Sequence, residues 1–476
     1  MSRWYELLQI NALFFGLNTL TVTNGFILPL LVQQIVGVTQ QGEYFGRVRL
    51  WSLMASILTQ SLMGVLSDGS HLRWGRRRPF ILAGTLGTLA FLLMITSSPV
   101  MRGESSFEIL LLLLILLQVA YNTACAGANG LIPDLVDVSQ RGIASGVKAL
   151  LEVPLPLLFV AFFVSPLISR GDFQPALYIG MAILLLTSLI TLTVKEPVPE
   201  AHTSAIKIEP LLRLFLMTAF FAAVILLLGA LVQLVARWPV EPTVWLQPVV
   251  VGFIGLFSIA LALLAGAWIS LRIGLGKAAL QGNPSYRWWI LHRLTFLAAI
   301  FNMGVFSVYF IQTRLGIKGE LAAGPGALFL ALLGILLAIT TLPGGWLADR
   351  YGKKRLAILG CLIAALGTII LLSSTHLAVV ILGGGLIGIG AGIVYAASWA
   401  LGTGLIPDGQ AGKYLGIQNL AAAGAGAVGA YLGGPIADYF GLYFTHLPGL
   451  GYLVLYAMFG VLFLLSAAAL LRVRSD

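Results

Sequence analysis

The sequence has little charge and almost no cysteine. Only 10% of its 476 residues are charged, whereas an ordinary soluble domain has about 25%, so the chain cannot cover a water-facing surface of its size. Its two cysteines, Cys125 and Cys361, are isolated from each other, which excludes a disulfide framework and a C-x-x-C metal site. The five histidines form no paired pattern. We therefore expect no metal and no cofactor.

Sequence motifs for ATP-driven transport and for enzymatic catalysis are also missing. The chain contains no G-x-x-x-x-G-K-[ST] phosphate-binding loop, which excludes ATP-driven transport by this chain. It shows no nucleophile–base or metal constellation, so we do not expect an enzyme. Its 55 glycines instead include a stripe of small residues, Gly384, Gly388 and Gly392, of the kind that lets membrane helices pack closely.

Long hydrophobic runs dominate what is present. Hydrophobic residues make up 59% of the chain, roughly 280 residues, and at about 20 residues for each helical span they would supply about fourteen spans. Runs of spanning length lie near 8–32, 47–66, 79–97, 107–131, 143–168, 174–194, 211–236, 247–271, 289–311, 325–347, 355–374, 377–402, 414–437 and 449–471. The sequence therefore predicts an all-α polytopic membrane protein with fourteen transmembrane helices.

The positive charges are distributed unevenly over the loops between these runs. Cytoplasmic loops of membrane proteins are enriched in Lys and Arg. With the N-terminus inside, 20 of the 28 Lys and Arg residues fall on the cytoplasmic side and 7 on the opposite side, while Lys148 lies within a span. This pattern predicts an integral protein of the plasma (cell inner) membrane with both termini cytoplasmic. It also explains the net charge of +10 without a nucleic-acid partner.

Two motifs recur at corresponding places of the chain. The loop after the second run contains Gly64-x-x-x-Asp68 and then Gly75-Arg76-Arg77-Arg78, and the loop after the tenth contains Gly345-x-x-x-Asp349 and then Gly352-Lys353-Lys354-Arg355. The tetrapeptide Leu-Ile-Pro-Asp follows both the fourth and the twelfth run, at 131–134 and 405–408. The first six spans therefore repeat as the last six in the same orientation.

This parallel repeat predicts two pseudo-symmetric six-helix bundles. The N-terminal bundle would comprise residues 1–194 and the C-terminal bundle residues 288–476. Residues 195–287 would form cytoplasmic linker segments and two inserted transmembrane helices. A repeat of this kind around a site at the middle of the membrane is the layout of a secondary transporter.

At these motifs the sequence resembles the major facilitator superfamily. The segment from Gly345 to Lys353 matches the signature loop of the superfamily, and the longer form from Ser67 to Phe80 is similar to the sucrose-transporter and glycoside–cation symporter branch. The resemblance implies two bundles that rock around a central cavity, with alternating access driven by an ion gradient or by the substrate alone. It also implies that the first, second, fourth and fifth helices of each half line this cavity.

The charged loops are predicted to form a conformational latch. A carboxylate at a helix end accepts charge-assisted hydrogen bonds from a guanidinium or from backbone N–H groups, and these bonds must break when the bundles rock. The predicted latch residues are Gly64, Asp68, Arg73, Gly75, Arg76, Gly345, Asp349, Arg350, Gly352 and Lys353. For Arg77, Arg78 and Arg355 we favour a simpler interpretation, in which they orient the chain and contact lipid phosphates.

Lys148 and Glu152 are the strongest candidates inside the membrane. They lie four residues apart, hence on one helical face. Because a charge in this region is costly unless it faces protein or water, the pair predicts a functional site. Burial favours the protonated form of Glu152 and Lys148 favours the ionised form, so a rocking motion could move a proton. Pro154 and Pro156 follow and allow a bend beside the pair. The alternative is a static pair in which Lys148 extends toward the cytoplasm.

Further polar and aromatic residues fall in the spans that the resemblance places around the cavity. The predicted substrate and proton pathway adds Asn18, Asn24, Gln60, Asn122, Asn302, Tyr309, Trp399 and Asn419 to Lys148 and Glu152, and Tyr395 is a weaker member. Amides and aromatic faces suit a hydroxyl-rich or an amphipathic ligand. Each residue has an alternative role as an interhelical hydrogen-bond partner or an interfacial anchor.

The sequence favours a secondary active transporter of a small organic solute, with protons as a possible second substrate. We expect a monomer in the lipid bilayer. Efflux of amphipaths or drugs, rather than sugar uptake, is the alternative within this class. A non-transporting assembly factor or sensor with the same fold is the alternative from another class.

Overall fold

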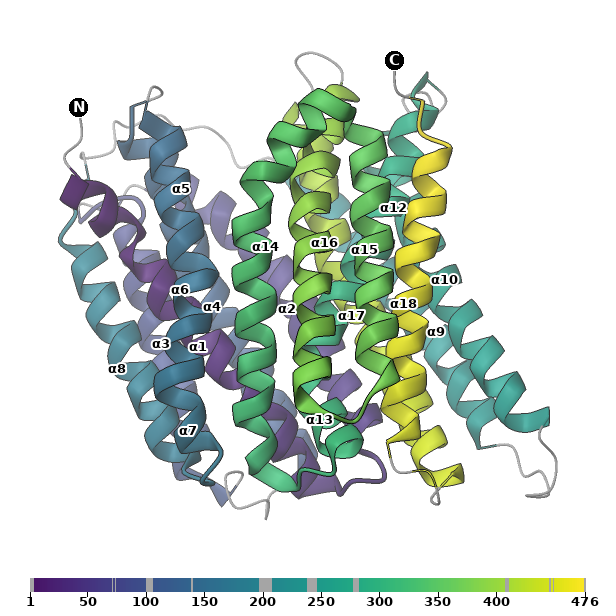
Figure 1. Cartoon of the computed structure of the whole chain (residues 1–476). Helices are drawn as coiled ribbons and strands as arrows, with labels where there is room; N and C mark the ends of the chain where they lie inside the picture. The colour runs from purple at the N-terminus through teal and green to yellow at the C-terminus, as the bar shows by residue number, and fades with distance from the viewer. Residues whose placement is uncertain are drawn as a thin grey trace. The chain divides into compact units, whose positions relative to one another are not determined.

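The computed structural model describes residues 4–70, 72, 74–99, 106–137, 140–196, 208–237, 246–276, 282–406, 411–444, 447 and 449–474; for residues 4, 142, 208, 210, 246 and 411–423 it describes the backbone alone. Within these residues every regular element is a helix (Figure 1), which confirms the predicted all-α fold. The latch residue Arg73 and the side chain of the pathway residue Asn419 lie outside what is described.

The first six predicted spans correspond to the first group of helices. These are α1 (Trp4–Val36), α2 (Gln41–Asp68), α3 (Arg78–Ser97), α4 (Phe107–Leu135), the composite α5 (Arg141–Glu152), α6 (Pro154–Phe159), η3 (Val160–Val164) and α7 (Ser165–Ile168), and finally α8 (Phe173–Leu192). The predicted insert corresponds to α9 (Ile208–Ala236) and α10 (Leu246–Gly274).

The remaining helices follow the second half of the predicted spans. These are α12 (Pro284–Val305), α13 (Ser307–Leu315), η4 (Gly319–Ala322), α14 (Ala323–Tyr351), α15 (Lys353–Ser373), α16 (Leu377–Gly404), α17 (Ala411–Tyr443) and α18 (Leu450–Leu471). Over the described residues, 13 helices are long and apolar enough to cross a membrane. The predicted span near 414–437 falls in α17, part of which has no described side chains.

The helices form two compact units. Unit 1 comprises Met1–Ile35 and Met54–Phe215, and unit 2 comprises Val36–Leu53 and Leu216–Asp476. The boundary crosses α2, so the first part of this helix packs in unit 2 and the rest in unit 1.

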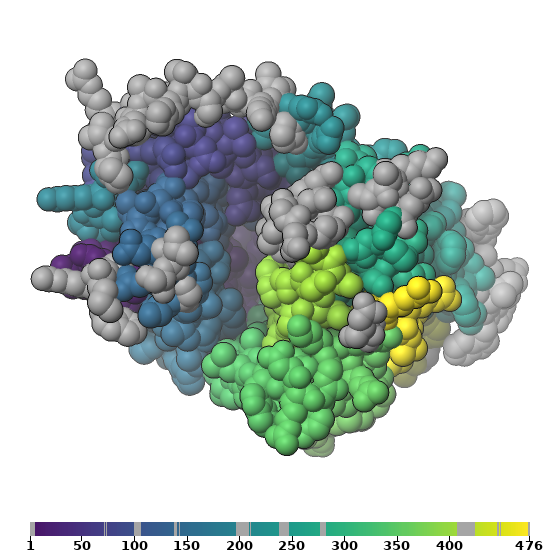
Figure 2. All heavy atoms as spheres, turned by 90° about the horizontal axis from the view of Figure 1, so that it is seen from above, coloured from purple at the N-terminus to yellow at the C-terminus, as the bar shows by residue number. Residues whose placement is uncertain are grey.

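Close helix packing in unit 2 depends on the glycine stripe of α16. A Cβ atom on Gly388 would lie 2.4 Å from the carbonyl oxygen of Leu333 in α14, and one on Gly392 would lie 2.4 Å from that of Leu337. Figure 1 shows α14, α15 and α16 side by side, and from above the green residues of α14 and α15 adjoin the yellow-green end of α16 (Figure 2). The predicted role of this stripe in packing is confirmed.

The fifth span of unit 1 is interrupted next to Glu152. α5 ends at Glu152, Val153 leaves the helical conformation with φ −123° and ψ −70°, and α6 begins at Pro154. Proline has no backbone N–H, so Pro154 and Pro156 cannot donate the helical bonds to the carbonyls of Leu150 and Glu152. The helix therefore breaks where the two prolines predict a bend.

Two helix starts differ from the predicted spans. α12 begins at Pro284, before the predicted span near 289, so Arg287 is a helical residue. The side chain of Asn283 accepts a hydrogen bond from the backbone N–H of Tyr286 at 3.0 Å, which fixes this early start. α2 likewise begins at Gln41, ahead of the apolar run. Charged residues lower the hydropathy of a segment without ending its helix.

Candidate functional site

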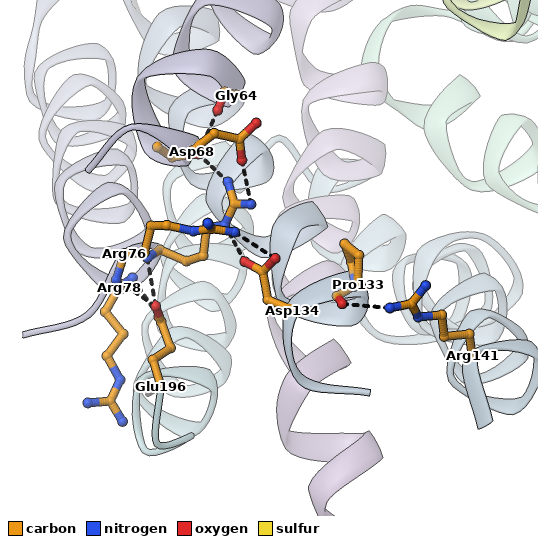
Figure 3. Close-up of polar contacts among 10 residues, drawn as sticks. Gly64, Asp68, Arg76, Arg78, Pro133, Asp134, Arg141 and Glu196 are labelled. Carbon is orange, nitrogen blue, oxygen red and sulfur yellow. Dashed lines mark hydrogen bonds and ion pairs between the residues drawn. The ribbon is translucent and has the colours of Figure 1, made fainter. Parts of the chain in front are cut away.

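An ion-pair cluster joins the ends of three helices in unit 1 (Figure 3). Arg77, just before α3, contacts Asp68 at the end of α2 at 2.5 Å and Asp134 near the end of α4 at 2.8 Å. Arg76 contacts the same Asp134 at 2.7 Å. Arg77 also donates a hydrogen bond to the hydroxyl of Ser67 at 2.6 Å. One guanidinium therefore connects α2, α3 and α4.

Glu196, which follows α8, holds the start of α3 in place through hydrogen bonds to its backbone. Its carboxylate accepts hydrogen bonds from the backbone N–H groups of Arg76, Arg77 and Arg78 at 2.7, 2.8 and 2.9 Å (Figure 3). The guanidinium of Arg78 donates to the carbonyl of Val194. A carboxylate at a helix N-terminus satisfies donors that the helix leaves unpaired and interacts favourably with its dipole. This contact orients the arginine segment toward Asp68 and Asp134.

Arg77 is the buried member of the cluster. It is 5% exposed. Burial lowers its pKa, but the hydrogen bond and charge of Asp134, together with Asp68, outweigh burial and raise the pKa above its ordinary value. From the sequence, Arg77 is expected only to orient the chain and contact lipid phosphates, and Asp134 and Glu196 are not among the candidate site residues. The recurrence of Leu-Ile-Pro-Asp is the sequence signal that points to Asp134.

The corresponding motif of unit 2 makes different contacts. Asp349 is exposed and forms no ion pair with a residue that the structure describes. Arg350 lies over the rings of Trp346 and Tyr351, at 5.6 and 5.7 Å from their centres. Lys353 begins α15, directly after Gly352.

Each of the two motifs, after α2 and after α14, has a glycine that allows the chain to turn. Gly75 and Gly352 have φ of 122° and 97°, a region that favours glycine, so both copies share the turn although only one shows the ion pairs. Gly64 accepts a hydrogen bond from Ser67 at its carbonyl, at 3.0 Å. Gly345 packs near the side chain of Ala396.

A polar cluster lies inside the spans of unit 1. Lys148 donates a hydrogen bond to the amide oxygen of Asn129 in α4 at 2.7 Å, and its Nζ lies 4.5 Å from the ring centre of Phe14 in α1. Its distance to Glu152 is 3.9 Å. Both side chains of this pair are partly accessible. The closest partner of Lys148 is therefore Asn129 on another helix.

The cluster continues along α4 toward α2. Asn129 donates to the sulfur of Cys125 at 3.3 Å, and Gln60 of α2 approaches the same sulfur at 3.9 Å. One turn further on, Ser56 of α2 donates to Asn122 of α4 at 3.0 Å. The structure thus brings four predicted pathway residues, Lys148, Glu152, Gln60 and Asn122, onto connected elements. Cys125 and Asn129 connect them.

The other predicted pathway residues have varied surroundings. Asn18 donates to the carbonyl of Phe14 within its own helix, and Asn24 is half-buried. Asn302 is buried and donates to the carbonyl of Ala298 in its own helix. Tyr309 is buried among the rings of Phe45, Phe306 and Tyr452.

Trp399 belongs to an aromatic group around Arg293 in unit 2. The guanidinium of Arg293 lies 5.1 Å from the ring of Trp399, 5.8 Å from that of Trp289 and 5.9 Å from that of Tyr395. Such distances allow cation–π attraction. Trp399 is 42% exposed. Arg293 is not among the site residues expected from the sequence, although it falls within the predicted span near 289–311.

The chain belongs to the Major Facilitator Superfamily, whose family model matches residues 12–285 and 289–476. Two solved structures share its fold. The nucleoside transporter NupG, in a variant form, has a TM-score of 0.65 and 14% identity, over 99% of this chain and 100% of that chain. A D-xylose–proton symporter has a TM-score of 0.65 and 14% identity, over 99% of this chain and 97% of that chain.

Two curated proteins match a short segment of the sequence. A general alpha-glucoside permease of Schizosaccharomyces pombe is 36% identical over 98 residues, which is 18% of this chain and 18% of the permease. A protein named as an uncharacterized transporter of Buchnera aphidicola is 35% identical over 96 residues, 19% of this chain and 24% of the relative. The chain thus spans less than a quarter of the length of either relative. All four proteins are transport proteins by name, and none is an enzyme.

Proposed function

We propose that the protein is a secondary active transporter that moves a small organic solute across the membrane by alternating access. The observation that carries this proposal is the polar cluster of Lys148, Glu152 and Asn129 beside the break in the fifth span. Ionised groups in a spanning region are costly unless they face protein or a water-filled cavity, and they mark substrate or ion pathways. Membership of the Major Facilitator Superfamily supports the same transport function.

Glu152 is the proposed proton carrier. It lies at the last residue of α5, where the helical bonds stop, and 3.9 Å from Lys148. α6 begins two residues after Glu152, so a change of angle between α5 and α6 would change the surroundings of the Glu152 carboxylate. The hydrogen bond of Lys148 to Asn129 of α4 does not involve Glu152. Protonation and conformation would thereby be coupled.

The ion-pair cluster around Arg77 is the proposed latch. It connects the ends of α2, α3 and α4, so any motion that separates these ends breaks charge-assisted bonds. The predicted latch includes the corresponding motif around Asp349. We assign the locking role to the copy at Asp68, because it has the ion pairs in this conformation.

The proposal includes the arrangement expected from the sequence. Residues 1–194 and 288–476 would be the two rocking bundles, and residues 195–287 would contain the inserted helix pair. There would be fourteen spans, both termini in the cytoplasm, and a location in the plasma (cell inner) membrane. The protein would act as a monomer with protons and a small solute as partners. The glucoside-permease match and the sequence motifs favour the sucrose-transporter and glycoside–cation symporter branch.

Cysteine labelling tests whether the protein alternates between conformations. In a Cys125→Ser, Cys361→Ser background, we would label Gln60→Cys in proteoliposomes with a membrane-impermeant maleimide. Gln60 is exposed on α2 and lies in the polar cluster. We expect its labelling rate to change about twofold or more when a proton gradient is imposed or when D-xylose or sucrose is added, because alternating access shifts the population of states.

Leu62→Cys provides the matched control. Leu62 is exposed on the same helix, two residues on and so on the opposite face. Its labelling should stay constant under all conditions. A constant rate at Gln60→Cys across the gradient and both sugars would contradict transport and favour the non-transporting sensor or assembly factor.

A further inference from the structure

A groove on the surface of unit 2 lies between α10, α12 and α18. Its volume is about 300 Å³. These three helices pack against one another within unit 2 (Figure 1). Leu264 of α10 and Leu465 of α18 line the groove and are exposed, so it opens on the surface of the protein. Because α10 belongs to the predicted insert, one wall of the groove comes from that insert.

The groove is apolar along its length and charged at one end. Its lining consists of leucine and alanine side chains apart from Trp288, Thr295 and Arg472. The hydroxyl of Thr295 donates to the carbonyl of Leu291 in its own helix at 2.8 Å, so it is not available to a ligand as a donor. Among the described residues that line the groove, Arg472 alone is charged, and it directly follows α18. The lining therefore has an apolar body and a cationic end.

The groove extends from the end of α18 into the span. Ten residues separate Arg472 from Leu462, the lining residue furthest from it on α18, which corresponds to about 15 Å along the helix axis. α12 runs alongside in the opposite direction, since Arg472 lies over Trp288 and the hydroxyl of Ser466 donates to the carbonyl of His292 at 3.0 Å. One leaflet accounts for half of a hydrocarbon core of about 30 Å. The groove is therefore as deep as one leaflet.

Arg472 is positioned at the mouth of the groove without a counter-charge. It is exposed, and its guanidinium lies 4.8 Å from the ring centre of Trp288. No ion pair among the residues that the structure describes includes Arg472. An aromatic ring attracts a cation but does not neutralise it, and a guanidinium stays protonated at any physiological pH. Arg472 therefore keeps a permanent positive charge at the mouth of the groove.

The helices around the groove have no acidic residue that could neutralise this charge. α10, α12 and α18 contain arginines or histidine but neither aspartate nor glutamate. Lys354 of α15 adds a second positive charge at the end of α18, where it donates to the carbonyls of Leu471 and Val473 at 3.0 and 2.6 Å. A ligand that complements this end of the groove must be an anion.

We infer that the groove binds an anionic phospholipid of the bilayer, with the phosphate at Arg472 and one acyl chain between α10, α12 and α18. The apolar lining matches the chain, the depth matches one leaflet, and the charge matches the headgroup. The planar guanidinium pairs with two phosphate oxygens at once, and basic pockets between transmembrane helices suit anionic headgroups. The bound lipid would hold α10 against α12 and α18. This site is separate from the proposed pathway in unit 1.

Phospholipids with different headgroups and the same acyl chains test this inference. The delipidated full-length protein would be titrated in mixed micelles with phosphatidylglycerol or phosphatidylcholine, with the thermal midpoint as readout. We expect phosphatidylglycerol to raise the midpoint of the wild type more than phosphatidylcholine does, since a ligand of the folded state stabilises it. Inorganic phosphate and glycerol phosphate carry the same anionic group without a chain, and we expect neither to raise the midpoint.

Three variants separate the headgroup contact from the chain contact. Arg472→Gln should weaken the affinity for phosphatidylglycerol about fivefold or more and leave phosphatidylcholine unaffected. Arg472→Lys keeps the charge without the planar fork and should retain an intermediate affinity. Ala468 lines the groove and is exposed on α18, so Ala468→Phe should fill the space of the chain and weaken the binding of phosphatidylglycerol. The midpoint of each variant without lipid reports whether it is folded.

Arg355→Gln is the matched control. Arg355 is exposed in the first turn of α15 and is not among the residues that line the groove. This variant loses the same charge and should bind phosphatidylglycerol like the wild type. If it loses as much affinity as Arg472→Gln, the effect is one of overall charge and the inference is wrong.

Three other results would also overturn the inference. Equal stabilisation by the two phospholipids would mean that the groove does not select an anionic headgroup. Stabilisation by inorganic phosphate equal to that by phosphatidylglycerol would indicate a site for a small anion. Normal binding of phosphatidylglycerol by Arg472→Gln or by Ala468→Phe would place the lipid elsewhere. The labelling of Gln60→Cys decides the proposed transport function separately from all of these results.

Discussion

Lys148 illustrates how the surroundings of one residue determine its chemistry. Its spacing from Glu152 predicts an ion pair, but its shortest contact is the amide oxygen of Asn129 on α4, at 2.7 Å. The amide and the ring of Phe14 stabilise the ammonium group without a full counter-charge. Glu152 is therefore not the contact that holds Lys148 in place.

Replacing Glu152 tests the proposed proton coupling at the residue scale. Glu152→Gln removes the ionisable group and keeps the size of the side chain. We expect solute uptake into proteoliposomes to lose its stimulation by an inward proton gradient, while exchange without a gradient continues. Glu209→Gln is the control, because Glu209 is exposed and pairs with Arg213 outside the polar cluster. Equal stimulation of Glu152→Gln and the wild type would rule out Glu152 as the proton carrier.

At the scale of the elements, the packing of α16 against α14 depends on glycines of α16, which have no side chain. Gly388→Ala would place its Cβ 2.4 Å from a carbonyl oxygen of α14, so the two helices must separate. We expect this variant to lower the thermal midpoint by several degrees, since overpacking costs about 1–3 kcal/mol. Gly404→Ala on the same helix is the control, because its Cβ would meet no atom within 4 Å. Equal midpoints for the two variants would contradict the packing argument.

The sequence predicts the helices well because each helix depends on the residues of its own segment. Apolar runs long enough to span a bilayer identify them, and the small-residue stripe of α16 and the prolines after Glu152 predict features that the structure contains. The start of α12 is not predictable from hydropathy, since Arg287 and Arg293 lower the apolar signal of residues that are helical.

The partners of charged residues are less predictable because tertiary contacts select them. Arg76, Arg77 and Arg78 are three consecutive arginines that the sequence alone does not distinguish. Arg77 is the buried one because of how α2, α3 and α4 pack. The choice of Asn129 for Lys148 likewise depends on how α4 meets α5.

At the scale of the whole molecule, α2 is shared between the two compact units. Its first part, up to Leu53, belongs to unit 2, and the part from Met54 belongs to unit 1. The carboxylate of Asp438 holds the first turn of α2 in unit 2 through two backbone N–H groups. Relative motion of the units must therefore either bend α2 or release its first turn from Asp438.

Hydrogen exchange tests this anchoring of α2. Asp438→Asn replaces a charged acceptor by a neutral one, so we expect the amides of Gly42 and Glu43 to exchange about 10-fold faster or more. Peptides covering 41–47, followed by mass spectrometry, would report the change. Asp349→Asn is the control, because Asp349 is exposed and has no ion pair with a described residue. Unchanged exchange in Asp438→Asn would mean that other contacts hold the first turn.

The break after Glu152 has a mechanical consequence. Bending a continuous helix stretches or removes hydrogen bonds on the outer side of the bend, and each lost bond opposes the motion. At α5 and α6 the bonds to the carbonyls of Leu150 and Glu152 are already missing, because Pro154 and Pro156 cannot donate them. A swivel at Val153 loses neither of these bonds. The fifth span therefore has a joint of low stiffness directly after Glu152.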